Sequence, residues 1–184
     1  MSERRAGHQD AVAAMLEQWQ REFPEVDATA LGVFSRLHRS FNRYQAQLNA
    51  FFETYDLTVP AFGVLAALRR AGSPYRRTVS ELADANLLTS GGITQRVDKL
   101  EAAGLALRVR DPDDRRIVHI QLTDRGLALA EEIIGAHFAH EADMLADLTD
   151  PERTELAGLL ARLESSLDRA AARGRGDVKA DGGA

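Results

Sequence analysis

The fold of this chain is decided by residues Thr78 to Gly126, TVSELADANLLTSGGITQRVDKLEAAGLALRVRDPDDRRIVHIQLTDRG, which hold its clearest helix-start, helix-stop and turn signals. Thr78 and Glu81 have the spacing of a capping box, in which each residue satisfies a free backbone N–H in the first turn of a helix. We expect a short helix to start there and to end in a turn at Asn86, Leu87 and Leu88.

A second helix should begin at Thr89 or Ser90, since either side chain can cap it. It should end at Gly104, because glycine accepts the left-handed conformation of a helix stop. Two strands are expected next, Leu105–Arg110 and Ile117–Leu122, joined by the turn-forming letters DPDD. Helix, turn, helix and hairpin together predict a winged helix-turn-helix.

Five further helices are expected around this core, each bounded by a cap, a proline or a turn. They are Asp10–Phe23, Thr29–Tyr55, Thr58–Arg70, Thr123–Leu148 and a last helix from Thr149 to Ala172. The chain is therefore expected to be mainly α with a small β-hairpin wing. We expect one domain over residues 1–172, with dimerisation helices at 10–57 and 123–172, a winged lobe at 58–122 and a disordered, Gly-rich tail at 173–184.

Apolar side chains on the second of these helices recur at alternating spacings of three and four, which is the pattern of a heptad seam. Such a seam is either an ordinary core or, in part, a surface between two subunits, because a thin helix cannot bury that much apolar area against itself. Its members are Phe34, Leu37, Phe41, Tyr44, Leu48, Phe51 and Tyr55.

Composition excludes several classes of protein. With no cysteine among its 184 residues, the chain has neither disulfides nor thiolate metal sites. No apolar run approaches the roughly 20 residues of a membrane span, and the charged N-terminus lacks the apolar segment of a signal peptide. We therefore expect a cytoplasmic protein that does not bind membranes.

The formal net charge of -5 argues at first sight against a nucleic-acid partner, because neutralising phosphates drives most of that affinity. The distribution of charge points the other way. Basic residues gather on the expected hairpin and on the helix before it, so that an acidic body carries a basic edge, as in DNA-binding proteins. They are Arg96, Lys99, Arg108, Arg110, Arg115 and Arg116.

The sequence LTSGGITQRVDKLEAAGL, followed by DPDDRR and LTDRG, strongly resembles the MarR family of bacterial transcription regulators. The order of the helices around the winged core is also similar, and DPDDRR followed after five residues by LT is the most specific part. The resemblance implies a homodimer on a palindromic operator of double-stranded DNA. Each subunit would place one recognition helix in the major groove and its wing alongside, and a ligand would release the DNA.

The residues of the second helix fit that role. Ile93, Val97 and Leu100 form a buried stripe on a helical wheel, which leaves Thr94 and Gln95 outward. Hydroxyl and amide side chains near a helix N-terminus suit base edges and phosphates, and glycines let the backbone come close. The competing interpretation of Ser-Gly-Gly is a solvated helix start. The expected DNA contacts from this helix are Ser90, Gly91, Gly92, Thr94, Gln95 and Lys99.

The wing is expected to contribute Arg110, Arg115 and Arg116. Asp111 and Asp114 are close enough in sequence to brace Arg116, which would hold Arg115 toward a minor groove, where narrow A·T tracts attract arginine. Which of the two arginines inserts is left open. A solvated charged turn is the alternative for Asp113 and Arg110.

A helix bearing a tryptophan before the main fold, here in QWQREFPEVD, is similar to a family subset that includes the urate-responsive regulators. In that subset the pocket uses the tryptophan, an arginine of the recognition helix and an aspartate of the preceding lobe. Trp19 and Arg96 match, but Gly63 occupies the acidic position, so we expect a different small anionic or aromatic effector. Arg96 could instead contact a phosphate, and Trp19 could be core.

His38, on the heptad seam, could also bind the ligand, or could be a satisfied interhelical histidine. No phosphate loop, HExxH motif or nucleophile elbow is found in the sequence, so we expect neither an enzyme nor a cofactor. His137 and His140, with Glu141 nearby, form the one candidate metal pair, against a solvated helix face. The alternative function is a helical interaction module that uses the winged fold as a scaffold.

Overall fold

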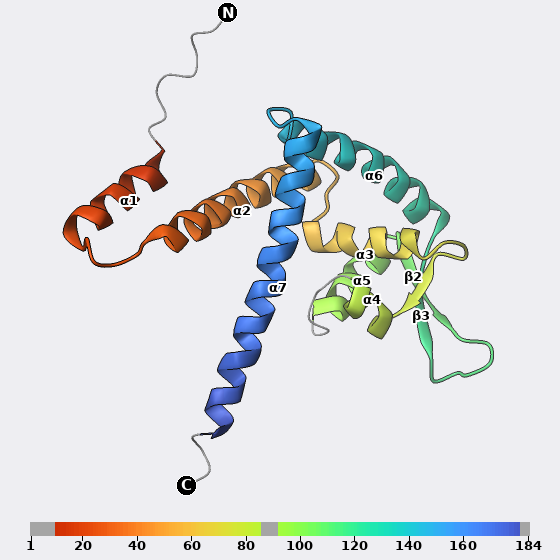
Figure 1. Cartoon of the computed structure of the whole chain (residues 1–184). Coiled ribbons are helices and arrows are strands. Elements are labelled where there is room, and N and C mark those ends of the chain that lie inside the picture. The colour runs from red at the N-terminus through yellow and green to blue at the C-terminus, as the bar shows by residue number, and fades with distance from the viewer. Residues whose placement is uncertain (1–9, 86–91, 181–184) are drawn as a thin grey trace, which may run out of the picture. The chain divides into compact units, whose positions relative to one another are not determined.

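A computed structural model of the chain describes residues 10–85 and 92–180. These residues form two compact units, Met1–Glu131 and Glu132–Ala184. The elements, labelled in Figure 1, are α1 (Ala11–Glu22), α2 (Thr29–Glu53), α3 (Val59–Arg70), β1 (Arg76–Thr78), α4 (Val79–Ala85), α5 (Ile93–Ala102), β2 (Ala106–Arg110), β3 (Val118–Leu122), α6 (Asp124–Met144) and α7 (Asp150–Ala180). The expected fold class, mainly α with a winged helix-turn-helix, is confirmed.

The predicted helix signals act as expected. Thr78 Oγ1 accepts the Glu81 N–H at 3.2 Å, and Glu81 Oε2 accepts the Thr78 N–H at 2.7 Å, so the capping box is complete. Gly104 has a φ of +68°, and its N–H and that of Leu105 bond back to Glu101 and Leu100, which closes α5 in a Schellman motif. Thr89 and Ser90, the expected caps of α5, lie outside the described residues.

The wing belongs to a three-stranded antiparallel sheet with strand order β1-β3-β2. The two wing strands were predicted to within a residue, but β1 was not, because Arg76–Thr78 is too short to show an alternating pattern. Thr78 faces His119 of β3, which in turn faces Val109 of β2. The strand that carries His119 is therefore covered on both edges.

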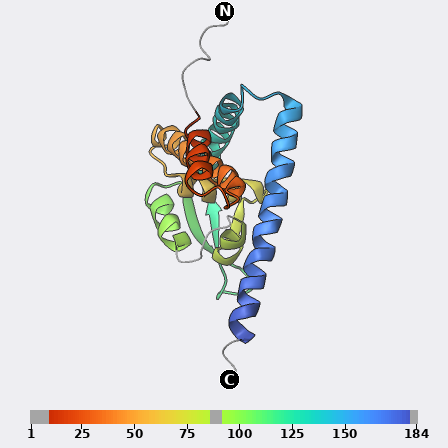
Figure 2. The ribbon, with the colours of Figure 1, turned by 60° about the vertical axis from the view of Figure 1, so that its left-hand side comes forward.

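The core of the first unit gathers around α3, which packs against α2, α4, α5 and β3 (Figure 2). Because α3 is buried on most sides, its apolar residues do not form one stripe. The three predicted core residues of α5, Ile93, Val97 and Leu100, are at most 1% exposed. Other fully buried side chains are Phe52, Val64, Leu65, Leu68, Leu82 and Ile120.

The heptad seam of α2 divides in two. Toward the end of the helix Leu48 is buried and Phe51 and Tyr55 are half-buried, while the fully buried Phe52 lies outside the predicted seam. Phe34, Leu37 and Phe41 are each at least 37% exposed on the part of α2 that leaves the lobe toward α1 (Figure 1). An apolar surface of this kind usually marks an interface.

The C-terminal end departs from the expectation. α7 is one helix from Asp150 to Ala180, and so runs past the expected end at Ala172 (Figure 1). The alanines and arginines after Asp168 are good helix formers and carry the helix on. No helix in the described residues is long and apolar enough to span a membrane.

Candidate nucleic-acid interface

The outer face of α5 is polar and accessible. Thr94, Gln95 and Lys99 are exposed, while the opposite face of the helix is fixed in the core. Gly92 precedes the helix without a side-chain cap of its own. Ser90 and Gly91, also expected on DNA, lie outside the described residues. The helix therefore presents short hydrogen-bonding side chains from a rigid support.

Arg96 does not share that outward direction. Its guanidinium folds back over Gly92, so that a Cβ added there would lie 3.0 Å from Nη2 and 3.1 Å from Cζ. Arg96 Nη1 is buried and has no hydrogen-bond partner among the described residues. A half-buried cation of this kind favours an anion beside the start of α5.

Arg108 fastens the wing to α5. From β2, its Nη2 donates to Asp98 Oδ1 at 2.5 Å, its Nη1 pairs with Glu101, and its own backbone N–H donates to Glu101 Oε1 at 3.2 Å. The hydrogen bond to Asp98 and the charge of Glu101 raise the pKa of Arg108. Although the sequence placed this residue in a basic cluster, its charge is neutralised by α5.

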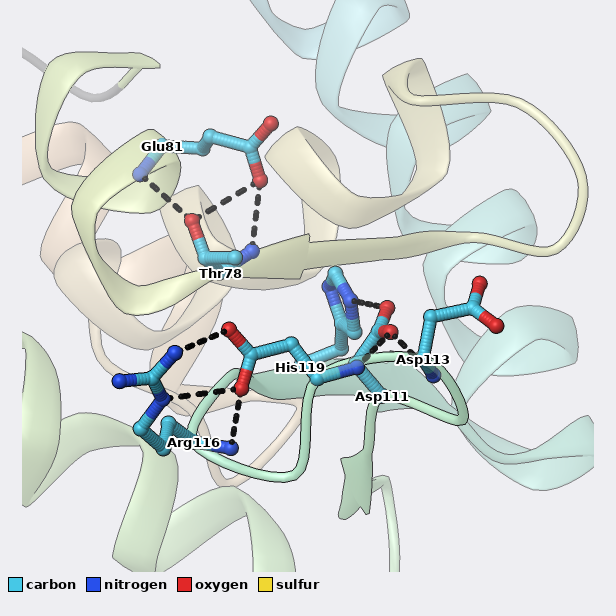
Figure 3. A network of polar contacts seen from close by, with 7 residues as sticks. Thr78, Glu81, Asp111, Asp113, Arg116 and His119 are labelled. Carbon is cyan, nitrogen blue, oxygen red and sulfur yellow. Dashed lines mark hydrogen bonds and ion pairs between the residues drawn. The ribbon is translucent and has the colours of Figure 1, made fainter.

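The wing loop is organised by Asp111. Its Oδ1 accepts the backbone N–H groups of Asp113 and Asp114 at 2.9 and 3.1 Å, and its Oδ2 accepts from His119 Nε2 at 2.9 Å (Figure 3). The hydrogen bond from His119 and those two amides hold the pKa of Asp111 at about 2. Asp111 therefore turns toward the sheet. The sequence had suggested that Asp111 braces Arg116, and it does not.

Asp114 provides the brace instead. Its Oδ1 accepts from the backbone N–H of Arg116 at 3.0 Å and from Arg116 Nε at 3.2 Å, and these bonds lower its pKa (Figure 3). Arg115 and Arg110 are exposed and have no ion pair among the described residues. Of the two arginines at the tip, Arg115 is thus the one with an uncommitted charge.

His119 was not anticipated. Its hydrogen bond to Asp111 crosses from β3 to the wing loop. A histidine eight positions after an aspartate does not predict a contact between the two unless the hairpin register is known. Once the two strands are placed in register, a pair across the base of the tip could be suspected.

The expected ligand residues are not brought together within one subunit. Trp19 is 46% exposed on α1, its ring 5.6 Å from that of Phe23, so core packing does not describe it. Both rings line a hollow of about 260 Å³ with Val26, Asp27, Ala28 and Leu31. Figure 1 shows α1 at the end of α2 that is remote from α5, the helix of Arg96.

His38 is exposed on α2, with its Nε2 3.0 Å from Asn42 Nδ2, so its partner is a neighbour on the same helix. His137 Nε2 lies 3.4 Å from Glu141 Oε1 on α6. Within residues 10–85 and 92–180, no group of three His, Cys, Asp or Glu side chains could hold a metal ion.

Comparisons with known proteins agree with this geometry. A family model described as MarR family matches residues 55–117. The chain is 36% identical to the HTH-type transcriptional regulator PecS of Dickeya dadantii (strain 3937) over 85% of this chain and 94% of PecS. It is 33% identical to the HTH-type transcriptional regulator MhqR of Bacillus subtilis (strain 168), over 71% of this chain and 86% of MhqR.

Two solved structures share the fold. One is from work on the regulation of DNA binding of Bordetella bronchiseptica BpsR by 6-hydroxynicotinic acid, with a TM-score of 0.64 and 27% identity over 72% of this chain and 92% of that one. The other is mutant MarR C80S from E. coli complexed with operator DNA, with a TM-score of 0.62 and 25% identity over 79% of this chain and 96% of that one.

Proposed function

Because this chain belongs to the MarR family of transcription regulators, we propose that it is a homodimeric repressor that leaves a palindromic operator when a small effector binds. Like its relatives, it is a DNA-binding regulator and not an enzyme. A protein that binds an operator works where the chromosome lies, so the cytoplasm remains our proposal for its location.

The observation that carries the proposal is the pairing of a polar helix face with an uncommitted wing arginine. Thr94 and Gln95 are exposed on α5, whose opposite face is immobilised in the core. Arg108 fixes the wing to that helix, so that Arg115 is held at a constant distance from it. Fixed spacing is what groove recognition requires.

The dimer is supported by the exposed apolar surface of the flanking helices. On α2, Phe34 and Phe41 are 44% and 54% exposed. On α7, Leu156 and Leu159 are 43% and 51% exposed. A second copy of the chain is the partner that we propose for these surfaces. Two recognition helices about 34 Å apart would then read successive major grooves.

We propose an anionic or aromatic effector. Trp19 and Phe23 offer an aromatic wall at the α1–α2 hollow, and Arg96 offers a half-buried cation whose buried Nη1 has no hydrogen-bond partner among the described residues. Within one subunit these groups are separate, so a shared pocket requires the second subunit. The acid named for BpsR, 6-hydroxynicotinic acid, has the same chemistry.

A fluorescence-anisotropy titration against DNA flanking the gene tests the proposed function. Three exposed cations face DNA in each subunit without an ion pair in the described residues, namely Lys99, Arg110 and Arg115. Six phosphate contacts per dimer give a slope of log K against log salt of about −5. The Arg115→Ala variant should lower that slope by about 2. A wild-type slope in the variant would show that the wing does not contact DNA.

The effector is tested by thermal shift with aromatic carboxylates and purines, since a ligand that binds the folded dimer raises its Tm. Hits should release labelled operator, and they should shift Arg96→Ala and Trp19→Ala less than wild type. Equal shifts in all three proteins would rule out this pocket. Failure to bind any DNA would favour the helical interaction module.

A further inference from the structure

His119 occupies the middle of the DNA-binding lobe. It lies on β3, the central strand, between Thr78 of β1 and Val109 of β2. Its side chain is 16% exposed and that of its partner Asp111 is 19% exposed, so the pair is largely screened from water. It is also the one histidine in the sequence between His38 and His137.

The tautomer of His119 follows from its partner. With a pKa of about 2, Asp111 is ionised at neutral pH, and a carboxylate can only accept hydrogen bonds. His119 Nε2 must therefore carry the proton in the 2.9 Å bond. The second proton can only go to Nδ1, which is buried and has no hydrogen-bond partner in the described part of the chain.

Charged groups from two elements lie near the imidazole. Asp111 faces it from the wing loop, and the charge of Glu81 on α4 interacts with it. Arg77 of β1 interacts with Glu81, but it pairs with Ile120 in the sheet and so lies on the other face from His119. Hydrogen bonds from Thr78 lower the pKa of Glu81, and the charges of Arg77 and His119 add to that effect. Figure 3 shows His119 between the Thr78–Glu81 capping box and the wing loop.

We propose that His119 is a positioning residue for the wing tip, and that its protonation makes operator binding tighter in mild acid. The inference rests on the proposed function, because it requires the wing to contact DNA. It adds to that function a dependence on pH that is built into the DNA-binding lobe itself.

The effect passes through Asp111. A second proton on His119 turns a neutral donor into a cation, and charge-assisted hydrogen bonds are stronger than neutral ones. The same carboxylate holds the backbone N–H groups of Asp113 and Asp114, next to Arg115. A firmer hold on Asp111 therefore keeps the tip in the shape that presents Arg115, and the added positive charge favours phosphate.

The test compares operator affinity at about pH 7.5 and about pH 5.5, the range in which histidine titrates. Wild type should bind about twofold to fivefold more tightly in acid, as expected when one neutral hydrogen bond becomes charge-assisted. His119→Gln keeps a donor but cannot gain a charge, so its dependence on pH should be reduced. The matched control is His137→Gln, which removes another histidine 3.4 Å from a carboxylate, but from α6.

A wild-type dependence on pH in His119→Gln would overturn the proposal. If that variant unfolds, Asp111→Asn tests the route through the carboxylate. It removes the negative partner and leaves the imidazole, so only the part of the pH dependence that comes from the added positive charge should remain. NMR of the free protein provides a readout without DNA. The amide signals of Asp113 and Asp114 should titrate together with the His119 ring, and independent titrations would contradict the positioning role even in a protein that binds no operator.

Discussion

Arg108→Ala should separate the task of holding the wing from the task of binding DNA. The guanidinium pairs with Asp98 at 2.5 Å and with Glu101, and both carboxylates belong to α5. Removing it breaks both pairs and leaves two carboxylates, three positions apart on α5, without their shared cation. The free energy of unfolding should fall, and the wing should lose its fixed position beside the recognition helix.

The size of the loss follows from exposure. The side chain of Arg108 is 35% exposed, and those of Asp98 and Glu101 are 57% and 38% exposed, so water screens both pairs. Exposed ion pairs contribute about 0.2 to 1 kcal/mol each, which puts the sum near 1 kcal/mol. For a chain of this length such a loss lowers Tm by about 2 to 4 °C.

Urea unfolding and a salt titration of operator binding together give the answer. Arg108→Ala should lower stability and affinity but leave the salt slope near the wild-type value, because a paired cation releases few counterions. Arg110→Ala, on the same strand and exposed, should instead lower the salt slope and leave the free energy of unfolding unchanged. If Arg108→Ala lowers the slope and leaves stability unchanged, Arg108 is a phosphate contact and the clamp is wrong.

Other positions give sharp tests. Gly126→Ala places a Cβ 1.8 Å from the Leu105 carbonyl oxygen, so it should destabilise by about 2 kcal/mol or more in urea unfolding, whereas Gly135→Ala meets nothing within 4 Å and should not. The pKa of Asp111 is lowered from 3.8 to about 2, so its stabilising effect is present above pH 3.8 and is lost as the pH falls through about 2. Acid unfolding of Asp111→Asn should accordingly show a weaker dependence on pH in that window. Gln95→Ala should weaken operator binding by about 1 to 3 kcal/mol if Gln95 contacts a base, and equal losses on random DNA would assign it to phosphate.

Local contacts were predictable from the sequence because their spacing is fixed by helix geometry. The Thr78–Glu81 capping box and the Gly104 stop involve residues at most a few positions apart. The buried stripe of α5 follows in the same way from a period of 3.6 residues. Such features require no knowledge of tertiary structure, and the helix boundaries that rest on them were nearly correct.

Contacts that cross between elements were not predictable. Arg108 meets Asp98 and Glu101 only because β2 returns along α5 after the Gly104 turn. Asp111 was assigned to Arg116 by closeness in sequence, yet its carboxylate caps the loop amides and receives His119 from the opposite strand. In a loop, neighbours in sequence can point in different directions, so spacing alone does not select a partner.

Some of the arginines form ion pairs and others do not, and this difference resolves the apparent conflict between an acidic chain and DNA binding. Counted from the sequence, Arg108 and Arg116 add to the basic edge, but the carboxylates of α5 and Asp114 neutralise them in the structure. Part of the excess of acidic side chains is thus structural, since these carboxylates hold the hairpin and its tip in place. In the function that we propose, DNA meets a smaller set of cations without ion pairs in the described residues, and for such a set correct spacing matters more than net charge.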